Sequence, residues 1–372
     1  MQVPFPKLEG LYLSIRGHSR FSLELPVLPD SFLGGSAPRL RHLYLNAVQF
    51  PGLPKLLLST TRLVNLYLRD IPQSGCISPQ AMATSLSMLT SLKTLKFEFQ
   101  FRPYYSHPEL KPRRPFPPIR SVLPTLTYFR FNGANKYLEE FVARIDAPQL
   151  CRLYTTFFDA EFKAPELSQF IISRMPTFGA CDEAHFIFNG CRALVRFCQS
   201  HPEPSDGRMV KVEILCDELR PSSMAETFTS LRFLSTMENL YIDGPAEGDY
   251  SADFWEDIQW LDFLRPFTAV KNLYLPELFS PPIALALEEF TGGRTTEVLP
   301  ALQNVFLEGF SPSEPVEEGI GQFISARQLT NRPVAISVWD RLFSETNGAL
   351  SSLQYSSFLS PALNRITSRS RS

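Results

Sequence analysis

A short phrase with apolar residues at its first, fourth and sixth positions recurs along the chain and constrains its fold more than any other feature. It has the form L-x-x-L-x-L in KLEGLYL at 7–13, RLRHLYL at 39–45, RLVNLYL at 62–68 and AVKNLYL at 269–275. Further copies begin at Leu92, Leu126, Met237 and Leu302, a degraded copy begins at Leu150, and a doubtful copy begins at Leu167. Most neighbouring copies start about 23 to 34 residues apart, a spacing typical of stacked repeats.

Each copy is expected to hold one short strand, because the apolar fourth and sixth positions alternate with polar or tyrosyl residues. Helix-like segments lie between copies at 81–92, 135–145, 253–264 and 282–290. One strand and one helix cannot bury an apolar face alone, so stacked units would bury it for one another. The sequence therefore predicts an α/β fold, a leucine-rich-repeat solenoid with a curved parallel sheet on the concave side and helices and loops on the convex side.

We predict one repeat domain over 1–342, interrupted by a Pro-rich basic insertion at 101–120 and followed by a partly disordered extension at 343–372. Strands are expected near HFIF and VKVEIL, although the pattern does not set the repeat register in 165–236. A doubly wound α/β sheet is the alternative architecture. Its buried strands should be near-continuous apolar runs, whereas the strands predicted here alternate.

The fifth position of each phrase is predicted to face solvent on the concave sheet, where strands about 4.8 Å apart would align these residues into one row. Because Tyr and Arg dominate many protein interfaces, we predict that this position-five row binds a protein partner. Aromatic neighbours also stiffen a sheet, so a purely structural role stays open. The predicted row consists of Tyr12, Tyr44, Tyr67, Lys96, Arg130, Tyr154, Tyr241, Tyr274 and Phe306.

The phrase P-x-L-x-x-L-Y-L, in irregular repeats of about 30 residues, resembles the leucine-rich-repeat portion of F-box proteins from mushroom-forming fungi. The resemblance covers about residues 5–342 and includes the ending GIGQFISARQLTNRPVAISVWDRL, which is interpreted as a helix and a last edge strand. It implies a substrate-recognition role in a ubiquitin ligase, where the F-box docks on the adaptor Skp1.

The sequence departs from this family in two places. The asparagine usually found three places after the sixth position is replaced by other residues, so no asparagine ladder is expected at the turns: the replacements are Val48, Ile71, Leu278 and Phe310. The first repeat begins at Leu8, and the segment at 25–35 makes a poor F-box because it runs into Pro29 and two glycines. Skp1 is therefore expected as a partner only if an F-box is missing from this version of the gene product.

Metal-ligating residue types occur together in one region, but without the spacing of a usual metal site. The group comprises Cys181, His185, Cys191, Cys198 and His201. The spacing is Cys-x3-His, then five residues, then six, then Cys-x2-His, with apolar strand and helix patterns in between, so buried structural cysteines are favoured over a zinc site. We expect neither a metal nor another cofactor.

Catalytic motifs are also lacking, since the sequence has no GxGxxG, GxxxxGK[ST] or GxSxG. The carboxylate pairs Glu139–Glu140 and Glu288–Glu289 are interpreted as solvated helix faces. The sequence therefore predicts a non-catalytic protein-interaction module. A leucine-rich-repeat scaffold or regulator outside the ubiquitin system is the first alternative, and an α/β enzyme is less favoured.

Composition argues against two further classes of partner. The net charge of −2 gives no attraction toward nucleic acid, and no apolar run approaches the roughly 18 residues of a membrane span. The start MQVPFPKLEG lacks a basic segment followed by an apolar one, so no signal peptide is expected. Six cysteines without a CxxC are expected to be reduced thiols, and we predict a cytoplasmic or nuclear location.

Overall fold

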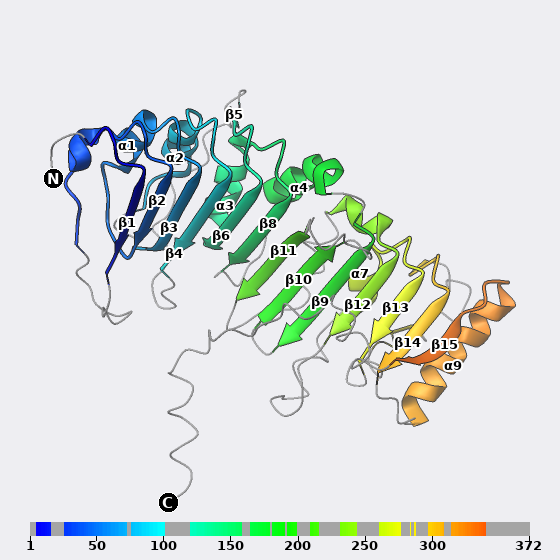
Figure 1. The fold of residues 1–372 in the computed structure, drawn as a ribbon. Coiled ribbons are helices and arrows are strands. Elements are labelled where there is room, and N and C mark those ends of the chain that lie inside the picture. The colour runs from blue at the N-terminus through cyan, green and yellow to red at the C-terminus, as the bar shows by residue number, and fades with distance from the viewer. Residues whose placement is uncertain are drawn as a thin grey trace, which may run out of the picture.

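The computed structural model describes residues 5–15, 26–72, 76–100, 120–157, 164–178, 181–189, 192–198, 209–215, 231–243, 260–276, 283, 286–287, 297–308 and 314–339. Within these residues the chain forms an α/β structure built on a 13-stranded sheet (Figure 1). The predicted insertion at 101–120, apart from Arg120, and the predicted extension at 343–372 lie outside the described residues.

The sheet contains, in spatial order, β1 (Gly10–Ser14), β2 (His42–Asn46), β3 (Asn65–Ile71), β4 (Thr94–Phe99), β6 (Tyr128–Gly133), β8 (Arg152–Phe157), β11 (Met209–Leu215), β10 (Arg192–Cys198), β9 (Glu183–Asn189), β12 (Asn239–Asp243), β13 (Asn272–Leu275), β14 (Asn304–Glu308) and β15 (Ala335–Trp339). Every neighbouring pair is parallel except the two pairs made by β10. A small second sheet pairs β5 (Ser121–Val122) with β7 (Ile145–Asp146).

The prediction of a sheet that is parallel throughout is wrong at β10, which runs antiparallel to both of its neighbours. The chain leaves β8, enters the sheet three places further on as β9, and fills the gap backwards with β10 and β11. Only residues 190 and 191 separate β9 from β10 in sequence. Such a short connection can join antiparallel strands but not parallel ones, which need a crossover of a dozen or more residues.

The helices are α1 (Leu53–Ser59), α2 (Pro79–Leu86), α3 (Asn135–Val142), α4 (Pro165–Phe178), α7 (Trp260–Leu264) and α9 (Glu314–Leu329), with 3-10 turns at Phe32–Gly35 and Arg232–Thr236. Helices α1 to α4 pack side by side, each on the next, along one side of the sheet (Figure 1). The predicted final helix and edge strand are present as α9 and β15.

Two predicted helices are shorter in the structure. The one expected over 81–92 is α2, which begins at Pro79 and ends at Leu86; the Ser78 hydroxyl caps it by accepting from the Ala81 amide at 3.2 Å. The one expected over 135–145 ends at Val142. Of the segments at 253–264 and 282–290, the described parts are α7 and residues 283, 286 and 287.

The core lies between the sheet and the helices and is built from the apolar positions of the repeated phrase. Leu43, Leu66 and Leu273 are completely buried, as predicted, and all three belong to the same sheet. Burying one such side chain contributes about 1.5–3 kcal/mol, so the stacked units hold each other in place. The edge strand β1 is the exception, because its Leu11 and Leu13 are only partly buried.

Two expectations for the region between β6 and β9 are wrong. The doubtful repeat copy at Leu167 lies in helix α4, where its period-three spacing also suits a helix. Glu139 is not on a solvated face: it is only 3% exposed, and its carboxylate accepts hydrogen bonds from the Glu166 and Leu167 amides at 2.9 and 2.8 Å. A side chain of α3 therefore satisfies the first turn of α4, whose amides have no partner within their own helix.

Candidate functional site

The predicted position-five row is continuous across the whole sheet. Each of its members is the register partner of the next, so that Tyr12 aligns with Tyr44, Tyr44 with Tyr67, and so on to the far edge. In spatial order the row reads Tyr12, Tyr44, Tyr67, Lys96, Arg130, Tyr154, Lys211, Arg196, His185, Tyr241, Tyr274, Phe306 and Ser337. All nine predicted residues therefore occupy one row.

Four residues of the row were missed by the sequence reasoning: Lys211, Arg196, His185 and Ser337. The first three lie on β9 to β11, which carry no complete L-x-x-L-x-L phrase. Strands were predicted near HFIF and VKVEIL, which are β9 and β11, whereas β10 was not predicted, and no local signal gives the neighbours of these strands. Only the pairing of β11 with β8 and of β9 with β12 brings them into the row.

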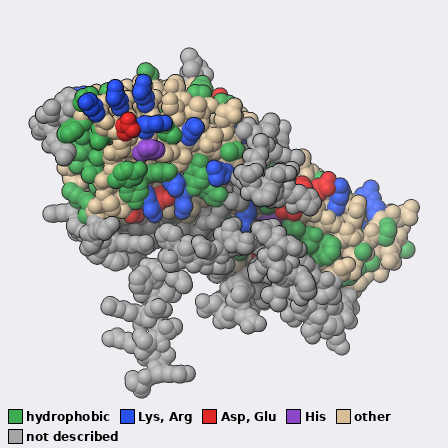
Figure 2. Space-filling view, in the orientation of Figure 1, with side chains coloured by type: hydrophobic (Ala, Val, Ile, Leu, Met, Phe, Trp, Pro, Cys, Tyr) green, Lys and Arg blue, Asp and Glu red, His purple; other side chains and the backbone are tan. Residues whose placement is uncertain are grey.

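Most of the row is partly exposed, whereas its centre is more enclosed. Tyr12 is 67% exposed, but His185 and Arg196 are each 8% exposed. Aromatic residues occupy the first three positions of the row and, toward the other end, the three positions before Ser337, and positively charged residue types lie near its middle. In Figure 2, blue Lys and Arg side chains gather among green hydrophobic ones over the part of the molecule that carries β1 to β8.

Aromatic rings pack differently at the two ends of the row. At the β12–β14 end, Tyr241 and Tyr274 stack with ring centroids 4.1 Å apart, and Tyr274 and Phe306 stack at 4.5 Å. At the β1–β3 end, the centroids of Tyr12 and Tyr44 are 6.2 Å apart, and those of Tyr44 and Tyr67 are 6.3 Å apart. The rings at the β12–β14 end are therefore in closer contact with one another than those at the β1–β3 end.

Cations near the middle are held by rings and by one carboxylate. The Lys96 ammonium lies 4.8 Å from the centre of the Tyr67 ring and 5.4 Å from that of Tyr128. Burial lowers the pKa of Lys96, and the neighbouring Arg130 lowers it further. Glu98, only 8% exposed, accepts from Arg69 at 2.7 Å and pairs with Arg130 at 3.2 Å. The Glu98 carboxylate thus offsets part of the local positive charge.

An asparagine ladder runs beside the row, on the third position of the phrase. The Asn304 amide donates to Asn272 at 2.7 Å, and the Asn272 amide donates to Asn239 at 2.7 Å. The ladder expected at the turns of the family is replaced here by one on the strands, whose hydrogen bonds were not predicted from the sequence. These hydrogen bonds between strands fix the third-position side chains next to the stacked rings.

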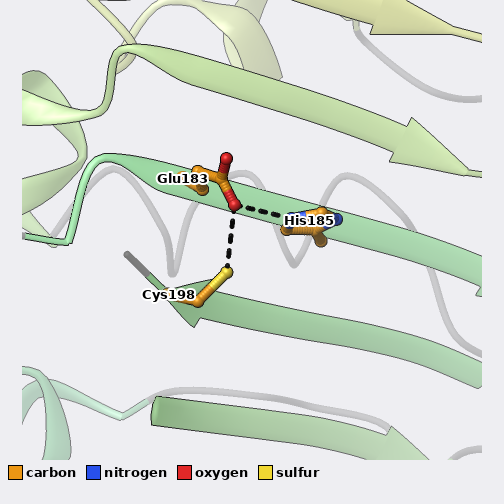
Figure 3. A group of neighbouring side chains, drawn as sticks. All are labelled: Glu183, His185 and Cys198. Carbon is orange, nitrogen blue, oxygen red and sulfur yellow. Dashed lines mark hydrogen bonds and ion pairs between the residues drawn. The ribbon is translucent and has the colours of Figure 1, made fainter. Parts of the chain in front are cut away.

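A polar cluster lies on the same face where β9 meets β10. The Glu183 carboxylate is 3.5 Å from His185 Nε2 and accepts from the Cys198 thiol at 3.4 Å (Figure 3). His185 and Cys198 belong to the group singled out in the sequence, whereas Glu183 was not noticed. Cys181 is buried, and Cys191 and His201 lie outside the described residues.

Nucleophilic catalysis by this cluster is disfavoured by its electrostatics. Burial raises the pKa of the Cys198 thiol well above its usual range, and the adjacent Glu183 raises it further. Reactive cysteines need the opposite shift, because the thiolate is the nucleophile. In addition, Cys198 and His185 both approach Glu183, so the histidine is not placed as a base on the thiol.

Comparison with known proteins finds neither a family model nor a curated protein that matches the sequence. Among the described residues, no helix has both the length and the apolar character needed to cross a membrane.

Proposed function

We propose that the chain is a leucine-rich-repeat solenoid that acts as a non-catalytic protein-interaction module, with the position-five row as its contact surface. The helices would lie on the convex side and the row on the concave side. The regular succession of phrase, strand and helix from β1 to β8, and again from β12 to β15, supports this architecture. The hairpin formed by β9 and β10 would be an insertion that keeps the sheet continuous.

The observation that carries the proposal is the unbroken row itself. Register partners on thirteen neighbouring strands present Tyr, Phe, Lys, Arg and His on one line, and these include the residue types that dominate protein interfaces. A surface of this kind suits an extended partner that crosses the strands and contacts several rings at once.

The resemblance to mushroom F-box proteins makes this partner a substrate of a ubiquitin ligase. The proposal would then assign Skp1 binding to an F-box encoded with the repeats. The rival, supported by the same row, is a scaffold or regulator outside the ubiquitin system. A pull-down with purified Skp1 and the product of the full transcript separates these possibilities, since only the receptor retains Skp1.

An α/β enzyme is supported less well by the described residues. One cavity lies between β2–β4 and the helices α1 to α3, and its lining is apolar except for Arg69 and the hydroxyl of Tyr137, which donates to the Ile77 carbonyl. The polar cluster of Glu183, His185 and Cys198 holds a thiol with a raised pKa, as described above. Neither place brings together an activated nucleophile and a base.

The experiment replaces rings at the loosely packed end of the row. A Tyr44→Ser, Tyr67→Ser double variant is compared with a matched Leu58→Ser, Met88→Ser variant, whose two side chains are 48% and 49% exposed and lie outside the row. Partners captured from extracts of the source cells by the wild-type chain are identified, purified and titrated against all three proteins. The row variant is expected to lose at least about tenfold in affinity, while the control keeps it.

Thermal melting is measured on the same three proteins. A lower melting temperature for the row variant with unchanged affinity would mean that the rings only stiffen the sheet. That outcome would remove the row from the contact surface.

A further inference from the structure

Three different metal-binding groups come together on the face of the sheet that carries the position-five row, namely those of Glu183, His185 and Cys198. Protein binding alone does not explain this convergence. One carboxylate oxygen, one imidazole nitrogen and one thiol sulfur all lie within 4.8 Å of one another (Figure 3). We propose that this cluster is a binding site for a divalent transition-metal ion of the zinc type.

The two separations that involve the Glu183 carboxylate match the edges of a metal coordination shell. Zinc binds nitrogen and oxygen at about 2.1 Å and sulfur at about 2.3 Å, which places tetrahedral ligands about 3.4 Å apart for nitrogen and oxygen and about 3.6 Å apart for sulfur and oxygen. The observed separations from Glu183 are 3.5 Å to His185 and 3.4 Å to Cys198. A direct hydrogen bond between nitrogen and oxygen would be nearer to about 2.9 Å.

Strand pairing brings the three residues close together on one face of the sheet. Glu183 and His185 are two residues apart on β9, so their side chains leave the same face of the sheet. Cys198 is the register partner of Glu183 on the antiparallel neighbour β10. Directly opposed residues in such a pair have Cβ atoms about 4.5–5.5 Å apart, which is close enough to share an ion.

The imidazole of His185 is already oriented by its neighbours. Its ring stacks on Tyr241 with centroids 4.1 Å apart and planes 3° apart, and Tyr241 stacks in turn on Tyr274. The stack fixes the plane of the imidazole ring, whose Nε2 lies toward Glu183. Groups that hold a ligand ring in place commonly strengthen a metal site, so Tyr241 is assigned as a positioning residue.

The chemistry of the donors selects the ion. A set of sulfur, nitrogen and oxygen suits Zn²⁺ or Co²⁺, whereas Mg²⁺ and Ca²⁺ prefer oxygen alone. On binding, the sulfur–metal bond forms, the S–H bond breaks, and the proton passes to the buffer. The dication then balances the two negative charges of Glu183 and the thiolate. Three protein ligands leave one position for water or for a group of a bound partner.

The cluster is accessible to an entering ion. The side chains of His185 and Glu183 remain 10% and 16% exposed, so the cluster is not sealed from solvent. Arg196 is the register partner of His185 on β10, so a positively charged residue lies next to the cluster.

The test uses the full chain, reduced and stripped of metal, and titrates it with Co²⁺. The expected result is one bound Co²⁺ per chain, with a thiolate-to-cobalt charge-transfer absorption in the near ultraviolet that Zn²⁺ abolishes by displacing the cobalt. Cys198→Ser should lose this absorption. His185→Gln and Glu183→Gln should each weaken Co²⁺ binding by at least about tenfold, and Tyr241→Leu should weaken it less.

Cys151→Ser is the matched control, since the Cys151 thiol donates to the Thr127 carbonyl and lies just before β8, away from the cluster on β9 and β10. It should retain both the absorption and the affinity. Absence of the absorption in the wild-type chain, or its persistence in Cys198→Ser, overturns the proposal. If circular dichroism shows that Cys198→Ser does not fold, the near-isosteric Glu183→Gln variant provides the test. A Co²⁺ affinity of Glu183→Gln equal to that of the wild type would then overturn the proposal. Because the readout involves no partner, the result leaves the interaction surface to be judged separately.

Discussion

The ring of His185 lies almost parallel to that of Tyr241, with 4.1 Å between their centroids, although the two residues come from strands far apart in the chain. His185 belongs to the region without clear repeats, and Tyr241 belongs to a complete repeat. Their stacking means that β9 continues the line of aromatic residues that begins at Phe306. The irregular region therefore completes the candidate interaction surface instead of interrupting it.

Replacing Glu139 should destabilise the protein far more than replacing its neighbour. Glu139→Ala removes two charge-assisted hydrogen bonds to the first turn of α4, and we expect a loss of about 2 kcal/mol in the free energy of unfolding. Urea denaturation measures it. Glu140→Ala is the control on the same helix and should change the free energy by no more than about 0.5 kcal/mol. Equal losses for both variants would contradict the capping role.

Removing the charge of Glu98 should destabilise the protein more than removing the charge of an exposed carboxylate with a similar partner. Glu98→Gln leaves Arg69 and Arg130 close together without their shared anion, and we expect a loss of about 1–2 kcal/mol in the free energy of unfolding. The control is Glu238→Gln, which removes a pair with Lys271 at 2.8 Å whose two side chains are nearly half exposed. That variant should lose less than about 1 kcal/mol, and its deficit should shrink in high salt.

Tyr137 should make stability fall in alkaline solution. Its hydroxyl donates to the Ile77 carbonyl at 2.9 Å, and burial raises its pKa well above the ordinary value, with a smaller contribution from Cys76. The folded protein thus keeps a proton that the unfolded chain releases above about pH 10, so the free energy of unfolding falls as the pH rises through that value.

Tyr137→Phe tests this prediction. The variant should be about 1 kcal/mol less stable than the wild type at pH 7, because it lacks the hydrogen bond. Above about pH 10 the wild type should lose stability faster than the variant, so the two curves converge. Parallel curves across this range, in denaturation experiments at matched pH, would count against a buried, protonated Tyr137.

Replacement by alanine should lower the stability of the protein at one glycine and raise it at another. A Cβ atom at Gly52 would lie 2.4 Å from the backbone oxygen of Asp30, so Gly52→Ala should cost at least about 1 kcal/mol. Gly321 lies within α9 with nothing within 4 Å of an added Cβ, so Gly321→Ala should stabilise the protein by up to about 1 kcal/mol. Thermal melting of both variants checks the signs, and a stabilised Gly52→Ala would contradict the close approach at that turn.

The repeated unit, and the face of the sheet on which each of its side chains lies, follow from local sequence alone. Leucines at the fourth and sixth positions lie inward, and Tyr44, Tyr67 and Tyr274 lie on the other face, because side chains alternate along a strand whatever its neighbours are. Successive parallel strands then align the same position of each phrase, which is why all nine predicted members of the row were found.

The order of the strands between β8 and β12 depends on contacts between distant segments. The sequence predicts strands at β9 and β11, but their alternation is satisfied equally by parallel and antiparallel neighbours, so it could not give their order or the place of β10. The pairing of Cys198 with Glu183 and the capping of α4 by Glu139 depend on that long-range arrangement. Backbone periodicity is a local property, whereas contacts between distant segments follow from the packing of the whole chain.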